Sequence, residues 1–127
     1  MTGNIGATTV IWTAVGVNPP VNACGIRAGG TSADPVFTVQ AGTCNGSDAD
    51  QLWRFTGTSS TGNWQQIQPP GNIGGFGVFS VDRSDPTHVI ASHFSGPNVS
   101  MIQTMDGGAT WQNLPALDAL MEHLRES

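Results

Sequence analysis

The chain has 127 residues, a formal net charge of −5 and only 10% charged residues. Its four basic residues are scattered arginines, whereas a nucleic-acid-binding surface needs clustered Lys and Arg. The longest apolar-leaning run, residues 8–17, is far shorter than the ~20 residues of a membrane span, and no signal peptide is visible. We therefore expect one domain with a hydrophobic core that binds neither nucleic acid nor membrane.

Uncharged polar residues and glycine must cover most of the surface, because charged residues are so few. Such surfaces are typical of extracellular β-proteins, so the composition favours an extracellular or periplasmic location. The 17 glycines and 8 prolines indicate many turns between short elements.

The chain reads as repeat units of short strands. Residues 1–17 hold one predicted strand, near 8–15, which we expect to be the last strand of a unit otherwise absent. Residues 18–70 form a first full unit, with strands predicted near 23–28, 36–41, 51–56 and 63–68. Residues 71–114 form a second, with strands predicted near 76–82, 88–94, 99–104 and 110–114.

The two full units share landmarks in the same order. Trp64-Gln65-Gln66-Ile67 in the first unit matches Trp111-Gln112-Asn113-Leu114 in the second. Ala33-Asp34-Pro35 likewise matches Ser84-Asp85-Pro86, where the aspartate is expected to cap a turn. Four strands in a repeat of ~40–50 residues are typical of a β-propeller blade.

The tail, residues 115–127, has a different pattern. Leu117, Leu120, Met121 and Leu124 recur at helical spacing, with charged residues on the other side. The pattern predicts an amphipathic helix over residues 115–126, with a proline in its first turn.

The most specific motif is the eight-residue stretch Thr104-Met105-Asp106-Gly107-Gly108-Ala109-Thr110-Trp111. Its Asp-Gly-Gly is a turn signal, because glycine tolerates the positive φ of a tight turn and the carboxylate can accept hydrogen bonds from turn amides. Trp111 can lay its ring over the hairpin. We therefore expect Asp106 to hold a turn and not to act as a catalytic acid or a metal ligand.

This stretch resembles the Asp-box, the S/T-x-D-x-G-x-T-W signature of the bacterial neuraminidase repeat in sialidase-like, xyloglucanase-like and sortilin-like β-propellers. In the first unit the corresponding segment, residues 58–64, lacks the aspartate. The resemblance implies a blade whose turn is held by Thr104, Asp106, Gly108, Thr110 and Trp111.

The same resemblance implies two possible kinds of catalytic site, a sialidase-like one and a xyloglucanase-like one. A sialidase-like site implies a tyrosine nucleophile with a glutamate partner, but the chain has no tyrosine and its glutamates, Glu122 and Glu126, lie in the tail. A xyloglucanase-like site needs two carboxylates facing each other across a cleft, and no aspartate pair stands out. We therefore assign no catalytic residue.

Five side chains remain as candidate ligand-binding residues. Trp53 and Arg54 could bind a carbohydrate, since an exposed aromatic ring can stack on a sugar, or Trp53 could belong to the sheet packing. Asp48 and Asp50 are either solvated loop residues or cation ligands. His93 could take part in acid–base chemistry, although no neighbouring motif singles it out.

The two cysteines, Cys24 and Cys44, lack the spacing of a metal site. If residues 23–28 and 36–40 pair as an antiparallel hairpin, Cys24 comes to the neighbourhood of Cys44. The sequence therefore allows a disulfide, with two small buried thiols as the alternative. We expect no metal ion and no cofactor.

Together these patterns predict an all-β fold of two four-stranded antiparallel propeller-type blades, one extra N-terminal strand and a short C-terminal helix. Propellers typically have ~4–8 blades, so two blades leave apolar sheet faces uncovered. Three explanations are open: chains associate as a dimer or trimer, the chain is a piece of a longer propeller, or the tail helix covers a sheet face.

The sequence thus favours a non-catalytic binding or assembly module, completed by homo-oligomerisation, with a carbohydrate or a protein as its ligand. The alternative is a fragment of a larger glycoside hydrolase, either sialidase-like or xyloglucanase-like.

Overall fold

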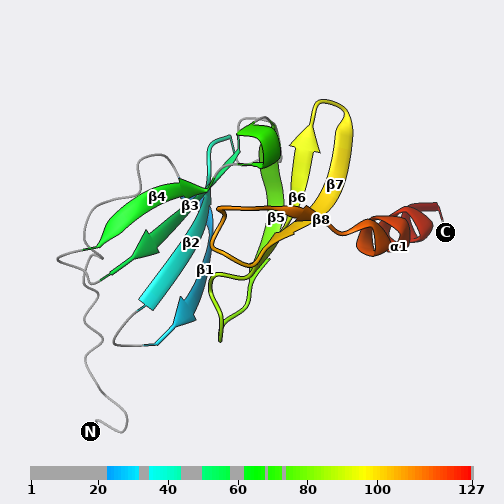
Figure 1. The fold of residues 1–127 in the computed structure, drawn as a ribbon. Coiled ribbons are helices and arrows are strands. Elements are labelled where there is room, and N and C mark those ends of the chain that lie inside the picture. Colours follow the sequence, from blue (N-terminus) through cyan, green and yellow to red (C-terminus); the bar gives the residue numbers. More distant parts are fainter. Residues whose placement is uncertain are drawn as a thin grey trace, which may run out of the picture.

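A computed structural model of the chain describes residues 23–31, 35–43, 50–57, 62–67, 69–72 and 74–126. These residues form two four-stranded antiparallel sheets and one C-terminal helix, which confirms the all-β prediction (Figure 1). The strand predicted near residues 8–15 lies outside the described residues. That the two sheets are propeller blades stays a prediction.

The first sheet follows the chain in simple antiparallel order. Its strands are β1 (Ala23–Gly30), β2 (Pro35–Ala41), β3 (Gln51–Thr56) and β4 (Asn63–Ile67). The predicted β1–β2 register is confirmed, because Ile26 faces Val39 and Arg27 faces Thr38. The assumption that residues 23–28 and 36–40 pair around the loop between them therefore located this hairpin correctly.

The second sheet has the same order and is preceded by a short 3-10 helix, η1 (Pro70–Asn72). Its strands are β5 (Gly75–Val81), β6 (Val89–Ser95), β7 (Asn98–Thr104) and β8 (Gln112–Asn113). The last strand is shorter than the predicted 110–114. Thr110 is held in the preceding turn by Asp106, and the carbonyl of Leu114 already accepts the first helical N–H groups.

The two sheets share one hydrophobic core. Leu52 and Ile67 of the first sheet belong to the same buried cluster as six residues of the second: Phe76, Phe79, Val81, Val89, Ala91 and Ile102. Trp111, partly buried, packs against this cluster. Burial of this apolar area is the main term holding one sheet to the other.

Polar contacts also cross between the sheets. The amide of Phe76 donates to the carbonyl of Asp50 at 2.9 Å, and the amide of Gly30 donates to the carbonyl of Arg83 at 3.2 Å. The guanidinium of Arg27 lies 5.3 Å from the centre of the Phe79 ring. These links fix the lateral position of the sheets, which apolar packing alone does not specify.

The helix α1 (Pro115–Glu126) confirms the predicted tail helix. It leads away from the sheets (Figure 1), and none of its residues is buried. Among the described elements it contacts only β7. The explanation in which the tail helix covers a sheet face of its own chain does not fit this arrangement, since the helix touches only β7 and none of its residues is buried.

Candidate functional site

The turn after β7 is built around the carboxylate of Asp106. The Thr104 hydroxyl donates to its Oδ1 at 2.7 Å and accepts the amide N–H of Gly108 at 2.8 Å. On the other side, the amide of Thr110 donates to Oδ1 at 2.8 Å and its hydroxyl donates to Oδ2 at 2.6 Å. Both carboxylate oxygens are thus engaged within the turn.

These hydrogen bonds lower the pKa of Asp106 from 3.8 to about 2. The Thr110 hydroxyl has the largest effect, followed by the Thr110 amide and the Thr104 hydroxyl, because each bond favours the ionised form. A carboxyl group with such a pKa carries no proton to donate near neutral pH. The chemistry of Asp106 is therefore that of a turn-holding anion.

We expect acid to weaken the fold through Asp106. Because its pKa is about 2 in the folded state and 3.8 in the unfolded state, the ionised carboxylate stabilises the fold fully above pH ~4 and loses this effect as the pH falls through about 2. Urea denaturation between pH 5 and 2, a range that runs from above the unfolded-state pKa down to the folded-state pKa, is expected to show a steeper loss of stability for the natural chain than for Asp106→Asn.

A second aspartate, Asp82, also makes the stability of the fold depend on pH in that experiment. The Ser84 hydroxyl lowers the pKa of Asp82, so the Asp106→Asn variant is expected to keep a shallower pH dependence. Equal slopes for the two proteins would contradict the assignment of the stabilising anion to Asp106.

The connection between β5 and β6 uses aspartates in the same way. Asp82 accepts the Ser84 amide at 2.8 Å and the Ser84 hydroxyl at 2.7 Å, while Asp85 accepts the amide of Thr87 at 3.2 Å. The prediction that Asp85 caps its turn is confirmed.

The Asp106 turn also packs on the first sheet. A Cβ placed on Gly107 would lie 1.9 Å from Nη1 of Arg54, and one on Gly108 would lie 2.2 Å from Cγ2 of Ile67. The Gly107 amide donates to the carbonyl of Thr87 at 2.9 Å. The glycines therefore serve two purposes, since they permit positive φ and let the backbone approach β3 and β4 closely.

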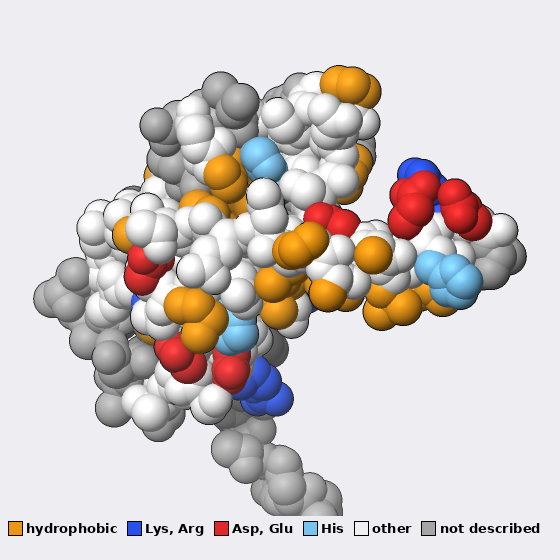
Figure 2. All heavy atoms as spheres, turned by 45° about the vertical axis from the view of Figure 1, so that its right-hand side comes forward, with side chains coloured by type: hydrophobic (Ala, Val, Ile, Leu, Met, Phe, Trp, Pro, Cys, Tyr) orange, Lys and Arg blue, Asp and Glu red, His pale blue; other side chains and the backbone are white. Residues whose placement is uncertain are grey.

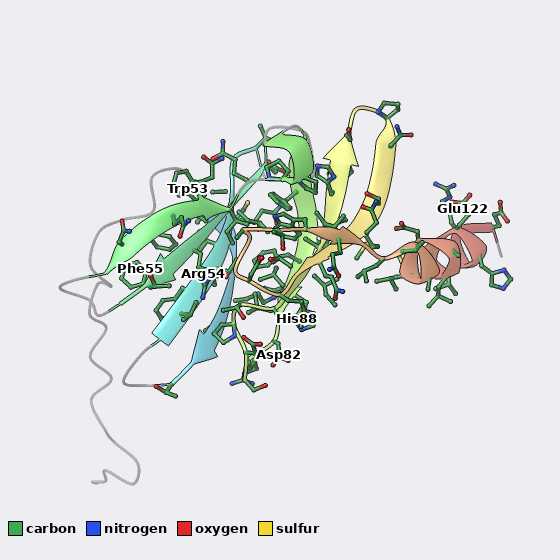
Figure 3. All side chains as sticks on the ribbon, viewed as in Figure 1. Trp53, Arg54, Phe55, Asp82, His88 and Glu122 are labelled. Atoms are coloured by element: carbon green, nitrogen blue, oxygen red, sulfur yellow. The ribbon has the colours of Figure 1, made fainter. Side chains whose placement is uncertain are left out.

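The structure separates Trp53 from Arg54, which the sequence offered together as a carbohydrate-binding pair. Arg54 is half-buried and extends from β3 toward the Asp106 turn (Figure 3), where its guanidinium lies against Gly107. Trp53 lies on the opposite face of the strand, partly buried, and its ring N–H donates to Oε1 of Gln51 at 2.9 Å. The two side chains do not meet in one site.

Asp50 and His93 are buried. Asp50 is 1% exposed, and its Oδ1 accepts the Thr43 hydroxyl at 2.8 Å, so the expectation of a solvated loop residue is wrong. His93 is 6% exposed, and its ring centre lies 6.1 Å from that of Phe76. Asp50 lies where the two sheets meet, since its carbonyl accepts the Phe76 amide, whereas His93 lies on β6 within the second sheet.

The other sequence-predicted site residues do not form a metal site in the described part of the chain. No cluster of three or more potential metal ligands occurs among those residues. Cys24 is disulfide-bonded, and Cys44, the other cysteine of the sequence, lies outside the described residues, as does Asp48. The Cys24–Cys44 pairing therefore stays a prediction.

A concave cleft with a volume of about 920 Å³ lies between the second sheet and α1. Its apolar lining comes from both sides: Val78, Phe94, Val99 and Met101 from the sheet, and Met121 and Leu124 from the helix. Figure 2 shows hydrophobic side chains along one side of this helix. We call this feature the α1 cleft.

Sequence reasoning identified the apolar stripe of the helix but not the α1 cleft. The helical spacing of Leu120, Met121 and Leu124 was visible, whereas the direction in which the helix leaves the sheet was not. Val78 and Val99 also lie at alternating strand positions, a pattern that predicts an apolar sheet face but does not predict which element packs on that face.

A scan against protein-family models found no match for this chain, and neither did a search of the curated proteins. The resemblance to Asp-box propellers therefore rests on the Asp106 stretch and the repeated landmarks. Within the described residues, no helix has the length and apolar character of a transmembrane segment.

Proposed function

We propose that this chain is a non-catalytic binding or assembly module, built from two Asp-box propeller-type blades and completed by self-association. Two features of the fold support the blade interpretation. Each sheet has four antiparallel strands in chain order, and the Asp106 turn joins the last two strands of the second sheet. The sheets also share one core, as neighbouring blades do.

The observation that carries the proposal is the exposed apolar surface beside α1. Val78 is 74% exposed and Val99 is 58% exposed on the sheet, while Leu124 is 60% exposed on the helix. Leu120 and Met121 are also more than half exposed. A soluble protein rarely exposes a contiguous patch of this kind unless it is an interaction surface.

The chemistry of Asp106 supports a structural role over a catalytic one. Its two oxygens are engaged by Thr104 and Thr110, and its pKa of about 2 keeps it ionised. General acid catalysis needs a carboxyl group that holds its proton near the working pH.

Molar mass as a function of concentration tests the proposal. We expect light scattering to show a dimer or trimer that forms between about 1 and about 200 µM, a range that spans the dissociation constants of weak specific complexes. A monomeric mass at every concentration in that range would overturn self-association.

The alternative is that the chain is a fragment of a larger glycoside hydrolase. It is favoured by the number of repeat units, since the chain has two and a closed propeller has ~4–8 blades. It predicts further Asp-box repeats, in frame, in the coding sequence next to this segment. Finding several such repeats would move the chain to this alternative.

A further inference from the structure

We infer that the occupant of the α1 cleft is a second copy of this chain, with α1 of each protomer lying on the β5–β7 face of the other across a two-fold axis. The inference rests on the proposed self-association. It identifies the α1 cleft as the surface through which two copies of the chain associate. It follows from the geometry of the helix, the character of the cleft and its charge.

The helix does not lie on a face of its own sheet. The amide of Leu114 donates to the carbonyl of Met101 at 2.8 Å, and Oδ1 of Asp118 accepts the amide of Met101 at 2.5 Å. These two bonds tie the first turn of α1 to the edge of β7. The rest of the helix leads outward, and of its apolar stripe Met121 and Leu124 line the open cleft that separates the helix from its own sheet.

Each chain therefore carries both halves of an apolar interface without being able to join them. One half is the stripe Leu120, Met121 and Leu124 on the helix, and the other includes Val78 and Val99 on the sheet. Two copies related by a two-fold axis satisfy both halves at once, because such an interface uses the same surface on each partner.

The cleft has room for part of the proposed occupant. A helix of 12 residues is ~18 Å long and ~10 Å across, which corresponds to a cylinder of ~1,400 Å³. The cleft volume of about 920 Å³ is more than half of this helix volume, so part of a docked helix would lie inside the cleft and the rest would lie outside it.

The charges of the cleft favour a copy of the same chain over a charged ligand. The charged side chains among its described lining residues are Asp118, Glu122 and Arg125. Asp118 accepts the Met101 amide, and Glu122 forms a 2.5 Å salt bridge with Arg125. A nucleic acid, a lipid headgroup or a strongly charged peptide needs a surplus of one sign, whereas a second copy presents the same nearly neutral apolar stripe.

The edge of β7 leaves room for this approach. The short strand β8 pairs only with Ile102 and Gln103, so within the described part of the chain no strand lies beside Asn98–Ser100 on that side. This segment carries neither a charge nor a proline, the usual devices that keep an edge strand from contacting another chain.

The contact is small. Two reciprocally docked helices of this length cover ~700 Å² when helix and sheet are counted on both protomers, which is below the ~1,200–2,000 Å² of stable specific complexes and corresponds to a weak, transient contact. We therefore expect a concentration-dependent dimer with a dissociation constant on the order of 10 µM.

Charge placed on the helix stripe tests the inference. In the full chain, the double substitution Leu120→Glu with Leu124→Glu is expected to raise the dimer dissociation constant at least about tenfold, measured by sedimentation equilibrium. The matched control is Ala119→Glu with His123→Glu, which adds the same charge to exposed positions on the other side of the helix and is expected to leave the constant unchanged. Because all four residues are exposed, circular dichroism is expected to show the same secondary structure.

A sheet-side variant makes the test independent of the helix. Val78→Asp is expected to weaken the dimer to a similar extent, since it charges the surface that receives the partner's helix. If the natural chain self-associates but the Leu120/Leu124 and Val78 variants keep its dissociation constant, or if it forms a trimer, the inference is overturned while the proposed assembly function stands. If the natural chain stays monomeric, both are overturned.

Discussion

Replacing Phe76 with alanine is expected to lower the free energy of unfolding by about 4 kcal/mol. Phe76 is 1% exposed, and its ring centre lies 5.2 Å from that of Trp111 and 6.1 Å from that of His93. Its amide also donates to Asp50 of the first sheet. The substitution removes a large ring from the place where the two sheets meet and leaves a cavity that this backbone link prevents from collapsing.

Urea denaturation with linear extrapolation measures this loss. The control is Ser80→Ala on the same strand, where the side chain is exposed and the expected change is within about 0.5 kcal/mol. A loss below about 1 kcal/mol for Phe76→Ala would mean that the shared core does not hold the two sheets together.

Replacing Gly108 with alanine is expected to cost about 4 kcal/mol as well, from two sources. Gly108 has a φ of +100°, a conformation that L-residues with a Cβ rarely adopt. The new Cβ would also lie 2.2 Å from Cγ2 of Ile67, which is 3% exposed and cannot move into solvent. Relief of this overlap requires the Asp106 turn to shift away from the first sheet.

Gly96 offers a matched control for the backbone term. It also has positive φ, +62°, but a Cβ there would meet no atom within 4 Å. Gly96→Ala is therefore expected to lose only ~1 kcal/mol from backbone strain. The difference between the two variants, again from urea denaturation, measures the packing of the turn on β4 together with the greater backbone strain at a φ of +100°. Equal losses would show that this packing contributes nothing.

The amino-acid sequence by itself determined the local elements. A hairpin closed by the loop between them located β1 and β2 and their register, with Ile26 opposite Val39. Helical spacing of Leu117, Leu120 and Leu124 located α1. The Asp-Gly-Gly turn was visible because its requirements, positive φ and a hydrogen-bonding carboxylate, are local properties of three consecutive residues.

The sequence did not determine which elements cover one another. It left open which face of β3 is buried, and in the folded chain both are covered, since Leu52 and Phe55 on opposite faces are fully buried. It also left Asp50 as either a solvated loop residue or a cation ligand, whereas the structure buries its side chain.

The tertiary structure alone decided the candidate site. The contact of Gly108 with Ile67 joins residues far apart in the chain, and the α1 cleft exists because Met101 holds the start of the helix at the edge of β7. Periodicity reports that a face is apolar, but the burial of that face depends on the position of another element. For the helix stripe, the proposed covering element is a second copy of the chain, which no pattern within one sequence can reveal.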